Sequence, residues 1–263
     1  LGLPYAGSGN SVVEDTILGM VTSEKNDYKG RVIIGVDTGV ALRYVIGNKK
    51  GLMGYGQMKD YSPDAKNGLA LEDTLEYFLK KWPNSVMVID QGGDIIGSRK
   101  LAAAYPGRVF LCHYARDRKT QQLIRWGEKD ESGNVIADRN RMIQLVIGEA
   151  KDRSFLLYGG NKNDWYDYWL HWSHIYRTVE MDTLERPQYV WHRSDRDDWV
   201  HATVYWRIGI DKFGQSGAIV GNDIDPDPNS YFINIDNTVS FNPEDMFNKG
   251  GFIAQQEEND WRD

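Results

Sequence analysis

Near-continuous apolar runs alternate with more polar stretches through the first half of the chain. Residues 31–37 and 85–90 are apolar almost throughout, which is typical of strands that are buried on both faces of a sheet. Residues 41–47 and 52–59 predict two further strands, and the polar residues 48–51 between them predict a hairpin turn.

Helical periodicity and short strand patterns follow in alternation. The predicted helices are residues 69–82, 94–104, 138–152 and 197–210; the further predicted strands are 108–114, 155–158 and 188–191, with a polar β-ribbon over 126–135 that turns at Ser132 and Gly133. Strands reached through helical crossovers are parallel neighbours in mixed α/β layers. We therefore expect an α/β fold with a mixed central sheet, in which three antiparallel strands continue into parallel strands, flanked by helices.

Two flanking segments differ in composition from this core. Residues 1–28 have Gly, Ser and Asn early on and little periodicity, so we expect a leader or linker and an ordered core that begins near Tyr28. Residues 213–263 are rich in Gly, Asn, Asp and Pro and end in an acidic run, which predicts an extended acidic tail. The folded domain is therefore expected to span residues 29–212.

Composition narrows the class of protein. The chain has 263 residues, 41% hydrophobic and 26% charged, with no apolar run long enough for a membrane span. Its single cysteine, Cys112, excludes an internal disulfide and suits a reducing cytoplasm. A net charge of −7 argues against a free-standing nucleic-acid binder. A local basic stripe can still hold DNA, and residues 108–125 contain five Lys or Arg against one acid, although such a run is also common on a solvated face.

Carboxylates stand at three places where core elements begin or end. Asp37 ends the run 31–37, Asp90 ends the run 85–90, and Asp197 with Asp198 opens the last predicted helix. Like charges placed together are costly unless they hold a cation. An all-oxygen cluster suits Mg²⁺ or Mn²⁺ rather than zinc, and two such ions can clamp the attacking and leaving oxygens of a phosphodiester.

Each of these positions also has an ordinary explanation. An Asp after a strand is commonly a turn residue, and Asp197 and Asp198 are natural residues for a helix start. His201 lies one turn after them and shares their face, as any helix histidine could. Only the combination of the three positions favours a metal site over these separate explanations.

The segments that carry these acids resemble a known family, the nuclease domain of bacteriophage large terminases, which has a ribonuclease H-like (RuvC-like) fold. The matching stretches are VIIGVDTG (32–39), VMVIDQGGD (86–94) and RSDRDDWVHATVYW (193–206), and residues 140–159 are similar to the family's helix before a short strand. The resemblance covers roughly residues 29–212. LGLPY at the start is similar to the connector after the ATPase motor, and the sequence contains no P-loop, so the chain is expected to be the nuclease half, following a missing motor.

The resemblance implies roles for individual residues. Asp37 matches the first metal-binding aspartate and Asp90 the second acidic ligand. In the third segment the spacing is kept, but His201 stands where the family more often has aspartate. The third ligand is therefore open among Asp197, Asp198 and His201. We favour Asp198, with His201 as a secondary ligand or a proton-handling group near neutral pH.

The function implied by the resemblance is metal-dependent endonuclease activity on concatemeric double-stranded viral DNA during genome packaging, with two Mg²⁺ or Mn²⁺ ions, in the host cell cytoplasm. The phosphate backbone would be held by Arg116, Arg118 and Lys119. The ribbon over 126–138 would contact the duplex or control access to the site. The ATPase motor domain of the same protein is an expected partner, a small terminase subunit and a portal are further candidates, and no membrane contact is expected.

Three alternatives accompany this interpretation. GVDTG at 35–39 also resembles a phosphate loop of the actin-like ATPase and sugar-kinase fold, but nothing after residue 212 supplies the second loop and lobe that this fold needs. A non-catalytic interaction module of the packaging motor would use the acids only structurally. A RuvC-like resolvase would act on branched DNA instead of linear duplex.

Overall fold

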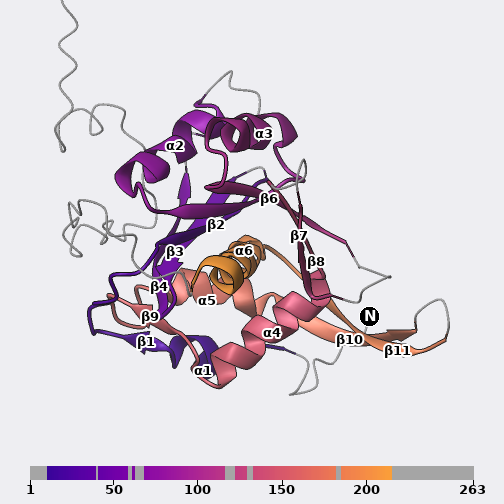
Figure 1. Cartoon of the computed structure of the whole chain (residues 1–263). Helices are drawn as coiled ribbons and strands as arrows, with labels where there is room; N and C mark the ends of the chain where they lie inside the picture. Colours follow the sequence, from indigo (N-terminus) through magenta and orange to yellow (C-terminus); the bar gives the residue numbers. More distant parts are fainter. Residues whose placement is uncertain are drawn as a thin grey trace, which may run out of the picture.

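The computed structural model describes residues 11–39, 41–58, 61–62, 68–115, 122–128, 133–181 and 185–214 (Figure 1). Its helices are α1 (Glu14–Leu18), α2 (Leu71–Lys81), α3 (Ile95–Ala104), α4 (Arg139–Lys151), α5 (Tyr166–Ser173) and α6 (Asp198–Phe213). Its strands are β1 (Val21–Thr22), β2 (Ile33–Asp37), β3 (Leu42–Asn48), β4 (Gly51–Met58), β5 (Val86–Asp90), β6 (Val109–Tyr114), β7 (Ile124–Trp126), β8 (Asn134–Ala137), β9 (Leu156–Tyr158), β10 (Ile175–Met181) and β11 (Pro187–Arg193).

Nine of these strands form one mixed sheet in the order β1-β9-β4-β3-β2-β5-β6-β8-β7. Strands β4, β3 and β2 are antiparallel, and β2 continues into β5, β6 and β8, which run parallel to one another. The edge strand β7 is antiparallel to β8, as the predicted ribbon requires. This arrangement confirms the predicted mixed central sheet, in which three antiparallel strands continue into parallel strands.

Helices cover both faces of the sheet (Figure 1). On one face, α2 and α3 pack over a core that includes Tyr44, Phe78 and Ile89. On the other, α1, α4, α5 and α6 enclose an aromatic-rich core. Burial on both faces explains why β2 and β5 read as continuous apolar runs, because neither face of these strands meets water.

The ordered core begins earlier than expected. Residues 11–28, which we expected to be part of a leader, contain α1 and β1, and β1 extends the sheet beside β9. Ile17 and Leu18 are buried against the core. The start near Tyr28 was therefore wrong: this segment is too short to show periodicity, yet its few apolar side chains close one end of the core.

Two further elements were missing from the prediction. Helix α5 has only eight residues and is rich in aromatic side chains, which are weaker helix formers than Ala or Leu, so its sequence gives a weak helical signal. Strand β10 pairs with β11 in a separate antiparallel ribbon that projects from the body of the molecule (Figure 1). Val179 and Met181 on it are exposed, so no core face gives it a burial pattern.

Residues 215–263, which include nearly all of the expected acidic tail, lie outside the described residues. None of the helices in the described ranges is both long enough and apolar enough to cross a membrane.

Candidate active site at the carboxyl ends of β2 and β5

Two of the predicted acids end neighbouring strands. Strands β2 and β5 are parallel and pair up to Val36 and Ile89, so the next residues, Asp37 and Asp90, leave the sheet side by side. Both side chains are partly exposed. The two carboxylates are therefore placed at the same edge of the sheet.

The hydroxyl of Thr38 ties the two strand ends together. Its Oγ1 lies 3.2 Å from the Asp90 carbonyl oxygen and 3.3 Å from Asp90 Oδ2. It also accepts hydrogen bonds from the backbone N–H groups of Gly93 at 3.1 Å and Asp94 at 3.4 Å. Thr38 is 5% exposed, so this cross-link is shielded from water and fixes the loop after β5 against the loop after β2.

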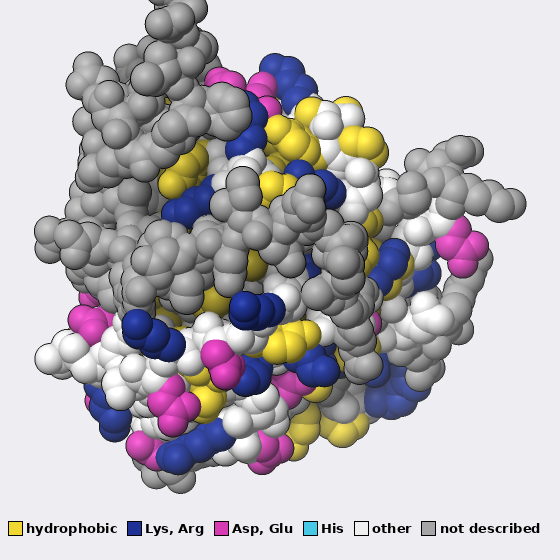
Figure 2. Space-filling model, turned by 60° about the vertical axis from the view of Figure 1, so that its left-hand side comes forward, with side chains coloured by type: hydrophobic (Ala, Val, Ile, Leu, Met, Phe, Trp, Pro, Cys, Tyr) yellow, Lys and Arg dark blue, Asp and Glu magenta, His cyan; other side chains and the backbone are white. Residues whose placement is uncertain are grey.

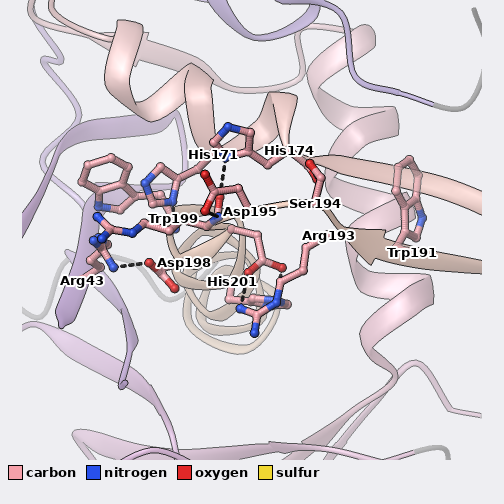
Figure 3. Close-up of polar contacts among 12 residues, drawn as sticks. Arg43, His171, His174, Trp191, Arg193, Ser194, Asp195, Asp198, Trp199 and His201 are labelled. Atoms are coloured by element: carbon pink, nitrogen blue, oxygen red, sulfur yellow. Dashed lines mark hydrogen bonds and ion pairs between the residues drawn. The ribbon is translucent and has the colours of Figure 1, made fainter. Parts of the chain in front are cut away.

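The third acidic position reaches this edge through α6. Asp197 occupies the N-cap of α6 and Asp198 its first turn, and the helix packs directly on β2. Asp198 forms an ion pair with Arg43 of β3 (Figure 3). Arg43 is itself the register partner of Asp37 in the β2–β3 pair. The first and third acidic positions therefore lie on either side of one arginine.

The pKa of Asp37 reports the electrostatics of this edge. Burial raises it well above the usual value, and the nearby charges of Asp90, Asp198 and Asp197 raise it further, while Arg43 lowers it only in part. The ionised form of Asp37 is thus disfavoured in the absence of an added cation. The three acidic positions that were separate in the sequence act on one another through space.

Asp197 and His201 are occupied by other contacts. Asp197 is 1% exposed; its carboxylate lies 3.0 Å from His201 Nε2 and accepts from Arg193 at 3.2 Å and from Arg139 at 3.5 Å. The other ring nitrogen of His201, Nδ1, is 2.9 Å from the Tyr114 hydroxyl. Burial raises the pKa of Asp197, but His201 and Arg193 outweigh it, so the pKa is lowered. These two side chains brace the start of α6 against β6, α4 and β11.

The donor set at this edge fits a divalent ion chemically. Asp37, Asp90 and Asp198 offer only oxygen ligands, which Mg²⁺ and Mn²⁺ prefer. The pKa of Asp37 is raised first by burial and then by the neighbouring acids, so an added cation would stabilise its ionised form. Within the described part of the chain, no three Asp, Glu, His or Cys side chains already lie close enough to hold one ion.

The structure does not describe the three residues that we expected to bind DNA. Arg116, Arg118 and Lys119 lie outside the described residues. Arg108, from the same basic run, is structural: its side chain donates to the carbonyl oxygens of Leu79, Trp82 and Ser85. On the face in Figure 2, the described Lys and Arg side chains are interspersed with Asp and Glu.

A groove of about 890 Å³ opens beside the acidic edge, between α4 and the β10–β11 ribbon. One end is lined by Tyr114 and Arg139, the residues that contact His201 and Asp197. Arg177, whose guanidinium lies 4.1 Å from the Tyr189 ring centre, lines the groove on the ribbon side. The sequence did not single out these residues, because their shared location arises only when α4 and the ribbon meet.

Arg43 is the functional candidate that sequence reasoning missed at the acidic edge itself. The available signal was a charged residue inside the otherwise apolar strand 41–47, which is unusual for a strand whose residues are all buried.

No protein-family model and no curated protein matches the sequence. Three solved structures are similar to the chain, all of the large terminase nuclease from thermophilic phage G20c. One is 11% identical and covers 78% of this chain and 99% of that chain, with a TM-score of 0.45. The form with bound magnesium is 10% identical; the match covers 76% of this chain and 97% of that chain, with a TM-score of 0.44. The form with bound cobalt is 12% identical; the match covers 76% of this chain and 97% of that chain, with a TM-score of 0.46. The chain is thus similar in structure to a large terminase nuclease.

Proposed function

We propose that the chain is a divalent-metal-dependent endonuclease that hydrolyses double-stranded DNA, acting on concatemeric viral DNA during genome packaging. The observation that carries this proposal is that Asp37 and Asp90 end neighbouring parallel strands, while Asp198 pairs with Arg43, the register partner of Asp37. Asp37 has its pKa raised by burial and by the other acids. Such a cluster is unfavourable for stability alone and becomes favourable when a cation binds.

Asp37, Asp90 and Asp198 are the residues that would hold the ions, which we take to be two Mg²⁺ or Mn²⁺. Bound there, the ions supply the positive charge that stabilises an in-line displacement at a phosphodiester. Thr38 keeps the Asp37 and Asp90 strand ends at a fixed separation. Asp37 and Asp90 are both partly exposed residues, which is compatible with access of a substrate phosphate to this edge.

Asp197 and His201 have a supporting role in this proposal. Both ring nitrogens of His201 and both carboxylate oxygens of Asp197 already have partners. We therefore assign the third ligand to Asp198, and we assign Asp197 and His201 to fixing the start of α6, so that Asp198 faces the strand ends. A group that orients a ligand in this way commonly affects activity without touching the ion.

The remaining parts of the proposal concern DNA and partners. We propose that Arg116, Arg118 and Lys119 contact the phosphate backbone of the DNA. With a net charge of −7, the chain would bind DNA weakly by itself. This favours a nuclease that an ATPase motor domain of the same protein holds on the DNA, with a small terminase and a portal as further partners.

Nicking of supercoiled plasmid in the presence of Mn²⁺ or Mg²⁺ tests the proposal. We expect Asp37→Ala and Asp90→Ala to lower the nicking rate by at least about 100-fold, because each removes a ligand, and chelation of the metal to abolish nicking. Asp195→Ala is the matched control, since Asp195 is exposed and lies in the same segment as Asp198. If Asp37→Ala and Asp90→Ala nick as fast as the parent chain, the nuclease proposal fails.

Two outcomes would favour the alternatives. A parent chain that binds Mn²⁺ but nicks no DNA supports the non-catalytic packaging module. Faster cleavage of a four-way junction than of linear duplex of the same sequence supports a RuvC-like resolvase.

A further inference from the structure

Arg43 is a buried arginine at the acidic edge. It lies in the middle strand of the antiparallel part of the sheet and is 5% exposed. Its guanidinium pairs with Asp198 and lies 5.6 Å from the Trp199 ring centre (Figure 3). A buried arginine is costly for the fold unless its charge and its donors are matched.

The charge and the hydrogen-bond donors of Arg43 are only partly matched. Within the described part of the chain, no acceptor bonds to its buried Nε. Asp37, its register partner on β2, attracts the guanidinium through space but makes no ion pair with it in the described structure. Arg43 therefore stands between two acids: it is paired with Asp198 and compensates the charge of Asp37 only in part.

Arg43 and the proposed metal ion both require the carboxylate of Asp198. Asp198 is the third ligand in the proposed function, yet Arg43 occupies it. A carboxylate that is bound to a guanidinium has less negative charge and fewer lone pairs available for a metal ion. The lack of a preformed three-residue ligand group among the described residues agrees with an edge in which one ligand is held elsewhere.

We infer that Arg43 is a built-in counter-ion that holds Asp198 when no divalent ion is present and that competes with the ion for this carboxylate. This inference rests on the proposed function. When an ion takes Asp198, the Arg43 guanidinium loses its partner and becomes available to an oxyanion at the same edge, such as a DNA phosphate. Arg43 is thus a positioning residue that keeps the third acid in place and neutralised until the ion binds.

Calorimetric titration of MnCl₂ into the whole chain, without DNA, tests this inference. We expect Arg43→Met to bind Mn²⁺ about tenfold more tightly or better, because a competing unit charge next to a ligand is removed. Methionine retains an unbranched side chain against Trp199. Arg43→Lys keeps a competing charge and should stay within about threefold of the parent chain. Arg207→Met is the matched control, because Arg207 lies on α6 but pairs with Glu149.

Equal or weaker Mn²⁺ binding by a folded Arg43→Met variant overturns the inference. If that variant does not fold, the parent chain itself supplies the test, through the Nε–H nuclear magnetic resonance signal of Arg43 during titration with MgCl₂. The signal is assigned with Arg43→Lys. We expect it to shift as the ion binds, and a signal that stays unchanged through saturation overturns the inference.

Failure of this inference differs from failure of the proposed function. A parent chain that neither binds Mn²⁺ nor nicks plasmid contradicts the proposed function. A parent chain that does both, with an affinity that Arg43→Met leaves unchanged, contradicts only the role of Arg43.

Discussion

A Cβ atom placed on Gly35 would lie 2.0 Å from the carbonyl oxygen of Ala202. Gly35 is in the middle of β2 and Ala202 is in the second turn of α6, so the helix backbone rests directly on the strand backbone. This close approach brings the start of α6, with Asp198, to the end of β2, where Asp37 lies. A glycine is therefore required here for a reason that connects the fold to the site.

Gly35→Ala should force α6 away from the sheet. We expect it to lower the free energy of unfolding by about 3 kcal/mol, the upper part of the range for overpacking a core, because the obstructing atoms are backbone. Urea denaturation measures this change. Gly54→Ala is the control, since no atom lies within 4 Å of a Cβ at Gly54. Equal stability of the two variants would show that α6 does not rest on β2 in this way.

Thr38→Val should weaken the link between the two strand ends. Valine has nearly the same shape but lacks the hydroxyl that contacts Asp90, Gly93 and Asp94. We expect a loss of about 1–2 kcal/mol in the free energy of unfolding, together with a lower nicking rate. Thr38→Ser retains the hydroxyl and should lose less of both. A valine variant that matches the serine variant in stability and rate would rule out the cross-link as a support of the site.

His201 and Asp198 should differ when they are replaced. Asp198→Asn is expected to reduce nicking by at least about 100-fold, because a charged ligand is lost. His201→Gln can still meet Asp197, so we expect it to reduce nicking by about tenfold or less, as for a residue that acts through another. Plasmid nicking and thermal unfolding of both variants provide the measurement. If His201→Gln is folded and as inactive as Asp198→Asn, His201 is a ligand after all.

His171 makes the stability of the chain depend on pH. It is 6% exposed, and its Nδ1 accepts a hydrogen bond from the Trp199 N–H at 3.4 Å. Burial, aided by Arg43 and His174, lowers its pKa from 6.5 to about 3. Between these two pH values the unfolded chain binds a proton at His171 and the folded chain does not, so stability is full above pH 6.5 and falls as the pH is lowered.

At pH 5 this loss should reach about 2 kcal/mol relative to neutral pH. Urea denaturation at several pH values measures it. His171→Asn removes the titrating group and should flatten this part of the pH profile, whereas His192→Asn, on the ribbon, should leave it in place. A profile that His171→Asn does not change would mean that other groups cause the acid sensitivity.

The sequence by itself determined the central part of the sheet and most of the helices that connect its strands. Runs such as 31–37 and 85–90 could be assigned because a strand buried on both faces must be apolar throughout. The placement of Asp37 and Asp90 together followed from this, since parallel neighbours end at the same edge. These predictions depend on local patterns and on one rule of sheet topology.

Only the tertiary structure decided the rest of the site. The pairing of Arg43 with Asp198 joins residues that are 155 positions apart, and no local pattern encodes such a contact. The same holds for the contact of His201 Nδ1 with Tyr114 on β6, which joins residues 87 positions apart, whereas the contact of His201 with Asp197 spans only one helical turn. Which carboxylate remains available for a cation depends on these partners, and the partners are set by how α6 packs on the sheet.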